Sequence, residues 1–167
     1  MKEISDELVM EIEDDASVID KTIHEIIDTY SKDLDEYIKF VLSVLKDDEK
    51  PPTDAELDDF ALNLSTLLYF ASVGCERMGI RDDLSMMRYK EVYNSIRSNL
   101  AKGTVADKNT EAELQAREER VINIIYNKSY KIMKAKVESA QDVLSSVKKV
   151  MSRRIAEREL SVIQTNK

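Results

Sequence analysis

Helix-breaking residues are almost absent from this sequence, and this constrains its fold more than any other feature. The 167 residues include three glycines and two prolines, and residues 1–50 and 104–167 contain neither. A protein built on strands needs a turn every few residues, and glycine and proline are common in those turns. The sequence therefore predicts an all-α fold, an elongated helical bundle with a long C-terminal helix or helical hairpin.

Apolar residues in the first third of the chain recur three and four residues apart, which is the spacing of one helix face. We expect this helix to begin near Ser17 or Asp20 and to end near Asp47. Residues 1–16 are acidic and less regular, and we expect them to form a loosely ordered N-terminal segment. The predicted buried stripe consists of Ile23, Ile27, Tyr30, Leu34, Tyr37, Val41 and Leu45.

A linker at Pro51-Pro52 separates this helix from the next one. Thr53 is expected to cap the second helix, and Glu56 stands three residues later, where it completes a capping box. This helix is apolar almost all round, so we expect it to be the most buried element. Its main face consists of Leu57, Phe60, Ala61, Leu64, Leu67, Leu68 and Ala71, with Tyr69 and Phe70 off that face.

Two glycines mark the expected ends of the remaining core helices. Gly79 follows the apolar second helix, and glycine is a common residue just after a helix. A third helix is expected from about Asp82 to Leu100, closed by Gly103. Residues 17–103 are thus predicted to form a helical core of three helices.

Residues 104–167 contain no residue that would end a helix. A straight helix over residues 107–161 would be ~80 Å long at about 1.5 Å per residue, which a single compact domain does not cover. We therefore expect this basic region either to fold back or to pack against other copies of the chain, and we assign homo-oligomerisation to it. The expected oligomerisation seam is formed by Val137, Ala140, Leu144, Val147 and Met151.

Charge is divided unevenly along the chain, whose formal net charge is -8. Residues 1–60 hold 20 acidic and 6 basic side chains, whereas residues 61–167 hold 13 acidic and 19 basic ones. A ladder of cations along a helix can follow a phosphodiester backbone, with Tyr126 and Tyr130 stacking on bases. The same cations can instead pair with the acidic half of the chain, and both explanations stay open. The candidate nucleic-acid-binding residues are Lys128, Lys131, Lys134, Lys136, Lys148, Lys149, Arg153, Arg154 and Arg158.

Residues with catalytic chemistry are few. His24 is the single histidine, and no serine or cysteine nucleophile has an obvious base partner, so we expect His24 to be structural. Carboxylates three or four residues apart, such as Glu25 with Asp28 and Glu7 with Glu11, could bind Mg²⁺ as in helical nucleotide pyrophosphohydrolases. Acidic residues are so frequent here that a solvated helix face explains these pairs better. We expect no enzyme activity, no metal and no cofactor.

The single cysteine, Cys75, excludes an internal disulfide, and we expect it to be a buried and unreactive core residue. The N-terminus is acidic and has no apolar signal region. The longest apolar stretch, residues 60–73, contains polar residues and is too short to cross a bilayer. We therefore expect a cytoplasmic protein without a membrane partner.

Short motifs in two parts of the chain resemble a known family. Val18-Ile19-Asp20 leads into a first helix that contains Tyr30-Ser31-Lys32, and Thr104-Val105-Ala106-Asp107-Lys108 opens the basic C-terminal region. Over residues 8–40 and 104–158 the chain is similar to the UvsY-type recombination mediators of tailed bacteriophages. The resemblance implies a helical, ring-forming protein that binds single-stranded DNA and helps to load a recombinase in the host cytoplasm.

The leading hypothesis is therefore a non-enzymatic, homo-oligomeric helical protein that binds single-stranded nucleic acid and acts as a phage recombination mediator. Weak sites on each subunit, summed around an oligomer, would give high avidity. The alternative is a structural or adaptor helical oligomer that binds no nucleic acid. A Mg²⁺-dependent nucleotide pyrophosphohydrolase is the third hypothesis.

Overall fold

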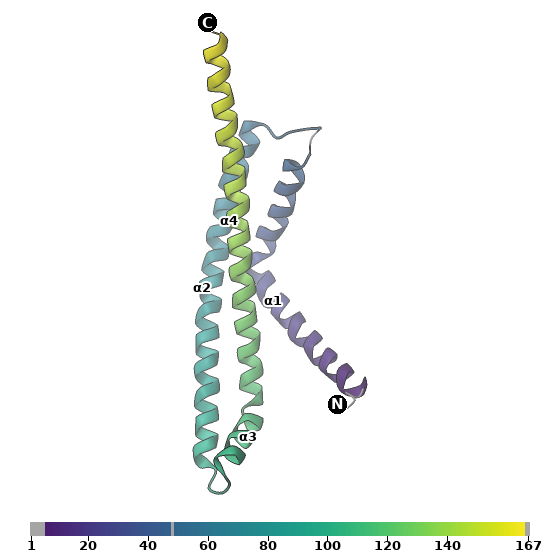
Figure 1. Cartoon of the computed structure of the whole chain (residues 1–167), viewed down its shortest axis with the longest axis vertical. Coiled ribbons are helices and arrows are strands. Elements are labelled where there is room, and N and C mark those ends of the chain that lie inside the picture. The colour runs from purple at the N-terminus through teal and green to yellow at the C-terminus, as the bar shows by residue number, and fades with distance from the viewer. Residues whose placement is uncertain (1–5, 48, 166–167) are drawn as a thin grey trace. The chain divides into compact units, whose positions relative to one another are not determined.

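A computed structural model describes residues 6–47 and 49–165 of the chain, and these residues form four helices (Figure 1). In chain order the helices are α1 (Asp6–Leu45), α2 (Asp54–Asn99), α3 (Val105–Gln115) and α4 (Arg117–Thr165). The described part of the chain contains no strand. The prediction of an all-α fold with a long C-terminal helix is thus confirmed.

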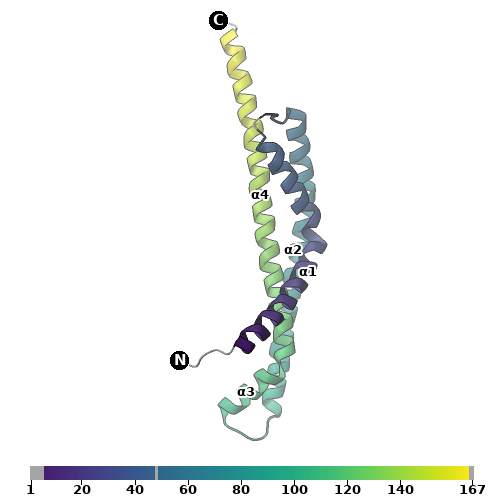
Figure 2. The same cartoon turned by 90° about the vertical axis from the view of Figure 1, so that its right-hand side faces the viewer.

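The chain divides into two compact units, and α1, α2 and α4 each contribute one part to each unit. Unit 1 combines the described residues up to Thr29 with Cys75–Ile132, and it includes α3. Unit 2 combines Tyr30–Gly74 with the described residues from Met133 onward. Within unit 1, α2 and α4 lie side by side in Figure 1 and overlap in the turned view of Figure 2, and a hydrogen bond from Asn123 to Asp82 joins them.

The predicted stripe of the first helix is the buried face of α1. Four of its members are buried, namely Ile23, Ile27, Leu34 and Val41, and three are half-buried, namely Tyr30, Tyr37 and Leu45. The helix begins earlier than expected, at Asp6. Acidic side chains are favourable in the first turns of a helix, and no glycine or proline stops the helix between Asp6 and Ser17. Residues 1–5 of the predicted N-terminal segment lie outside the described residues.

The capping box at the start of α2 is confirmed. The backbone N–H of Thr53 donates to Glu56 Oε2 at 2.6 Å, and the backbone N–H of Glu56 donates to Thr53 Oγ1 at 3.2 Å. Before this cap, the Asp47 carboxylate accepts hydrogen bonds from the backbone N–H groups of Glu49 and Lys50. The predicted linker is thus a short, hydrogen-bonded connection between α1 and α2.

The prediction of three helices in residues 17–103 is wrong, because α2 continues without a break to Asn99. Gly79 lies inside this helix and does not end it. A Cβ atom at Gly79 would stand 3.3 Å from Cε2 of Tyr130 on α4. The absence of a side chain at Gly79 therefore allows the Tyr130 ring to approach α2 closely, and it does not mark a left-handed helix end.

The prediction that the second helix is the most buried element is wrong for one of its faces. The main face is buried at Leu57, Phe60, Leu64, Leu68 and Ala71. Tyr69 and Phe70, which lie off that face, are 66% and 63% exposed. An apolar composition all round a helix predicts burial all round only when neighbours cover every side, and unit 2 supplies neighbours on one side of α2.

The C-terminal region forms two helices. Gly103 has a φ of 112°, and Thr104 caps α3 with a capping box to Asp107. The helix ends at Gln115, and the backbone N–H of the following C-cap residue, Ala116, donates to the carbonyl of Ala112 at 3.0 Å. The sequence contains no glycine or proline at this break, so spacing alone left one helix or two as open alternatives.

Candidate interaction surfaces

Three of the predicted nucleic-acid-binding cations form ion pairs with acidic residues of the first third of the chain. In unit 2, Lys136 pairs with Asp35, and their side chains are 31% and 28% exposed. The hydroxyl of Ser31, which is buried, donates to the same Asp35 carboxylate at 3.1 Å. The ion pair joins α4 to α1 within unit 2, and the hydrogen bond from Ser31, which lies in α1 itself, holds the Asp35 carboxylate in place.

The carboxylate of Asp54 pairs with the other two of these cations, Arg154 and Arg158. Arg154 Nη1 donates to Asp54 Oδ1 at 3.2 Å and to the carbonyl oxygen of Pro52 at 2.5 Å, and Arg158 pairs with the second oxygen of Asp54. The hydrogen bond from Arg154, followed by that from Arg158, lowers the pKa of Asp54 below its ordinary value. Because Asp54 is the first residue of α2, the two arginines bind the start of this helix.

Arg153 is paired within its own helix. Its Nε donates to Glu157 Oε1 at 2.9 Å, and both side chains are exposed.

In unit 1, Arg117 lies 3.8 Å from the carboxylate of Asp15, also at the surface. The pairing of basic residues of α4 with the acidic half of the chain, which the sequence left open, therefore occurs at several positions.

Five predicted cations remain on the surface of α4 without an ion pair to any described residue. Unit 1 contains Lys128 and Lys131, and unit 2 contains Lys134, Lys148 and Lys149. All five side chains are exposed. Of the two tyrosines expected to stack on bases, Tyr130 packs its ring at Gly79 of α2. The structure thus separates the nine predicted cations into paired and solvated residues.

The predicted oligomerisation seam lies largely inside unit 2. Val137, Ala140 and Val147 are buried, whereas Leu144 and Met151 are half-buried. Buried side chains are already covered by the chain's own helices. A second copy could contact only the remaining part of this seam.

The outer patch, as we call it, is an apolar surface of unit 2 on the side of α2 away from its buried face. It consists of Leu62, Tyr69, Phe70 and Val73, whose side chains are 67%, 66%, 63% and 37% exposed. The rings of Tyr69 and Phe70 meet edge to face, with centroids 5.4 Å apart. The sequence places Tyr69 and Phe70 off the main face of this helix, and this spacing was the signal for a second surface, although burial all round was expected.

Ser65 and Thr66, two polar residues that lie between members of the outer patch in the sequence, use their hydroxyl groups inside their own helix. Ser65 Oγ donates to the carbonyl of Ala61 at 2.7 Å, and Thr66 Oγ1 donates to the carbonyl of Leu62 at 3.0 Å. Covering a polar group is costly when it loses its hydrogen bonds to water without replacement. These two donors keep their partners, so covering Ser65 and Thr66 carries little polar cost.

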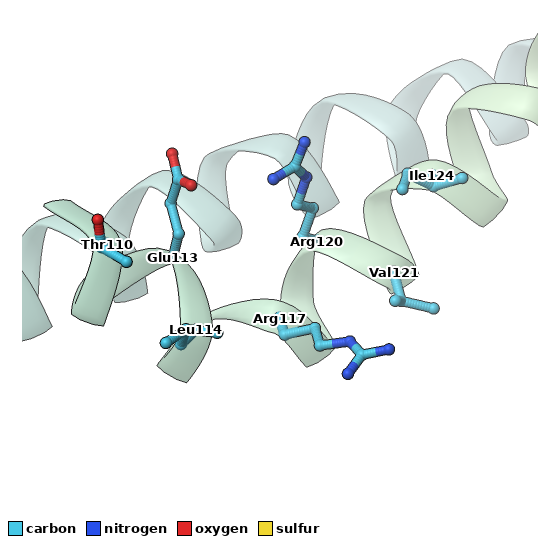
Figure 3. A pocket seen from close by; sticks show the side chains of 7 residues that line it. All are labelled: Thr110, Glu113, Leu114, Arg117, Arg120, Val121 and Ile124. Atoms are coloured by element: carbon cyan, nitrogen blue, oxygen red, sulfur yellow. The ribbon is translucent and has the colours of Figure 1, made fainter. Parts of the chain in front are cut away.

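A groove of about 450 Å³ in unit 1 lies where α3 ends and α4 begins (Figure 3). Leu114, Val121 and Ile124 give it an apolar lining, and Arg117 and Arg120 add two cations. In Figure 3 the side chains of Glu113 and Arg120 extend to the same side, away from that of Arg117. Sequence spacing did not reveal this groove, because the break at Ala116 creates it.

The remaining candidates for chemistry are dispersed. His24 is exposed, and its Nδ1 donates to the carbonyl of Asp20 at 2.9 Å. Cys75 is buried, as expected. Glu25 and Asp28 are exposed, and the side chains of Glu7 and Glu11 lie outside the described part of the chain.

The described residues offer neither a metal site nor a membrane-spanning helix. They include no group of three or more histidine, cysteine, aspartate or glutamate side chains placed to hold a metal ion. None of their helices has both the length and the apolar character needed to cross a membrane. No protein-family model, curated protein or solved structure matches the sequence.

Proposed function

We propose that this protein is a non-enzymatic structural or adaptor protein that works as a homo-oligomer of helical subunits. The observation that carries the proposal is the outer patch of α2, where three large side chains are more than 60% exposed. Clusters of exposed apolar side chains of this kind commonly mark protein–protein contacts. Two of the three are aromatic, the class of residue that is enriched in such contacts.

The distribution of ion pairs supports the same proposal. Lys136, Arg154 and Arg158, which a nucleic acid would need as phosphate ligands, bind carboxylates of α1 and α2 within the chain. A cation that already pairs with a carboxylate gains less from a phosphate, because the first pair must be broken. Their role in this proposal is to join helices of one subunit.

The mass of the protein in solution tests the proposal. Light scattering at micromolar concentration should give a multiple of 19.2 kDa. Tyr69→Glu should reduce this mass, because burying an unpaired carboxylate at an apolar contact costs several kcal/mol. Ser139→Glu adds the same charge to an exposed position of α4 and should leave the mass unchanged. A wild-type protein that scatters as a monomer would overturn the proposal.

A second candidate function, binding of single-stranded nucleic acid, is favoured by the five solvated lysines of α4. Exposed lysines without ion pairs are the residues of this chain best able to neutralise phosphates. The recombination-mediator role implied by the family resemblance, with single-stranded DNA and a recombinase as partners, depends on this candidate. Retention of an oligothymidylate that weakens as salt rises would support it, and no retention at low salt would exclude it.

A further inference from the structure

The outer patch of α2 has the size that a self-association surface needs. If a fully exposed aromatic side chain offers about 150–250 Å², the exposed fractions of Leu62, Tyr69, Phe70 and Val73 leave about 400 Å² uncovered. Two copies would then bury about 800 Å², and Ser65 and Thr66 between them bring the total near 1,000 Å², the lower limit of a specific interface. The patch therefore suffices for a dimer contact between two copies of unit 2.

Large and small side chains along the patch are ordered so that, when a second copy runs in the opposite direction, large residues of one copy meet smaller residues of the other. Leu62, Thr66, Tyr69 and Val73 follow one another at spacings of four, three and four residues, a sequence that reads the same in both directions. In an antiparallel pair of helices, Leu62 faces Val73 and Tyr69 faces Thr66. Each contact then joins a large side chain to a smaller one, which is how side chains interdigitate well.

A parallel pair would lack this fit. It would place Tyr69 against Tyr69 and Thr66 against Thr66 at the same level, with large residues meeting large ones and small residues meeting small ones. An interface between two identical surfaces related by a two-fold axis requires self-complementarity. The antiparallel arrangement provides it.

Charge favours the same orientation. Residues 54–74 of α2 contain four acidic side chains, Asp54, Glu56, Asp58 and Asp59, and no basic one. A parallel pair would bring Asp58 and Asp59 of both copies to the same level. With the two-fold axis midway between Thr66 and Tyr69, the Asp58 residues of the two copies lie about 28 Å apart along the axis at about 1.5 Å per residue. This distance exceeds the Debye length of about 8 Å at physiological salt, so the repulsion is screened.

We infer that the outer patch of α2 binds the outer patch of a second copy of this chain, with the two α2 helices antiparallel and their two-fold axis between Thr66 and Tyr69. This inference rests on the proposed function, because it names the contact and the orientation by which the homo-oligomer forms. The antiparallel contact differs from the predicted seam on α4, most of which is buried inside unit 2.

Paired cysteine variants test the orientation. We expect Leu62→Cys mixed with Val73→Cys to give a disulfide-linked dimer on mild oxidation, because these positions face each other in the antiparallel pair. Neither variant alone should cross-link through its new cysteine, since its two copies would lie about 16 Å apart along the axis at about 1.5 Å per residue. Wild type, which carries only the buried Cys75, is the control, and mass spectrometry of the linked peptides identifies the cysteines.

Each other outcome has a distinct meaning. Cross-linking of each variant with itself, without the mixed dimer, would overturn the antiparallel orientation in favour of a parallel pair. An oligomer by light scattering that forms neither kind of disulfide would overturn the outer patch as the contact and leave the proposed function standing. A monomer by light scattering would remove the proposed function and this inference together.

Discussion

Gly74 of α2 lies against Tyr30 of α1 within unit 2, and a Cβ atom at position 74 would stand 2.7 Å from the Cβ of Tyr30. The Cβ of Tyr30 is fixed to the backbone, so it cannot move aside as the tip of a long side chain can. We therefore expect Gly74→Ala to force the two helices apart. Overpacking costs about 1–3 kcal/mol, and the better helix propensity of alanine returns up to about 1 kcal/mol.

The net effect of Gly74→Ala should be a fall of about 1–2 kcal/mol in the free energy of unfolding, measured by urea denaturation. Gly79→Ala is the matched control on the same helix. A Cβ at Gly79 would stand 3.3 Å from the outer part of the Tyr130 ring, which can shift by a few tenths of an ångström. We expect this variant to be neutral or more stable by up to about 1 kcal/mol. Equal losses in both variants would contradict the explanation.

Local patterns predicted much of this fold because they describe interactions between residues close in sequence. The stripe containing Ile27, Leu34 and Val41 depends on helical spacing alone, and these residues are buried. The capping box of Thr53 and Glu56 depends on four consecutive residues, and its hydrogen bonds are present. Neither required knowledge of what packs against the helix.

The failures share one physical cause, which is that they depended on distant residues. A glycine that ends a helix and a glycine that admits a ring look alike in sequence, and only Tyr130 distinguishes Gly79. Similarly, Lys136 could face solvent, nucleic acid or a carboxylate, and its partner Asp35 is 101 residues away. Spacing identified the basic residues of α4 but not which of them are paired.

The Asp35–Lys136 pair should stabilise the chain measurably, because both side chains are less than one-third exposed. Exposed ion pairs contribute up to about 1 kcal/mol and breaking buried ones costs about 3–5 kcal/mol, so we expect Lys136→Met to cost about 1–2 kcal/mol. Asp35→Asn should cost a similar amount. The double variant should be more stable than the sum of the two losses implies, with a coupling of at least about 0.5 kcal/mol. Additive losses by urea denaturation would show that the pair contributes nothing.

In unit 1, Asn123 of α4 and two residues of α2, Ser85 and Asp82, form a cluster of hydrogen-bonded polar side chains. Buried Asn123 donates to Ser85 at 3.0 Å and to Asp82 at 3.3 Å. Asn123→Ala should therefore lower the free energy of unfolding by about 1–3 kcal/mol, because Ser85 and Asp82 lose a buried partner. Ser129 Oγ is buried and has no hydrogen-bond partner within the described residues. Ser129→Ala should be neutral or stabilising, and a loss as large as that of Asn123→Ala would contradict this.

The cap of α2 should make stability depend on pH in the acidic range. The backbone N–H of Thr53, and then its hydroxyl, donate to Glu56 and lower the pKa of this carboxyl below its ordinary value of 4.5. The unfolded chain therefore binds this proton at a higher pH than the folded chain does. The stabilisation is complete above pH 4.5 and is lost as the pH falls below that value.

The variant Glu56→Gln keeps a side chain that can complete a capping box but removes the titrating charge. Its melting temperature should lie below that of wild type at pH 7, and the difference should shrink as the pH is lowered to 3. Melting curves followed by circular dichroism across this range measure it. A difference that does not change with pH would mean that the ionised form of Glu56 is not the stabilising one.

Nucleic-acid binding and internal charge pairing can be separated by two double variants in unit 2. Lys148 and Lys149 are exposed without an ion pair to any described residue, whereas Arg154 and Arg158 bind Asp54. If the lysines contact phosphates, the logarithm of affinity for an oligothymidylate should fall with the logarithm of salt concentration. The slope is about -0.7 for each neutralised phosphate of a single strand. Replacing Lys148 and Lys149 with alanine should then flatten the slope by roughly 1.4 and leave melting nearly unchanged, since exposed charges contribute under about 1 kcal/mol each.

Replacing Arg154 and Arg158 with alanine should have the opposite effects. The melting temperature should fall through the loss of their bonds to the start of α2, while the slope stays the same. A slope that flattens only in the arginine variant would mean that the paired residues exchange their carboxylate for phosphate on binding, which the separation into paired and solvated cations does not allow.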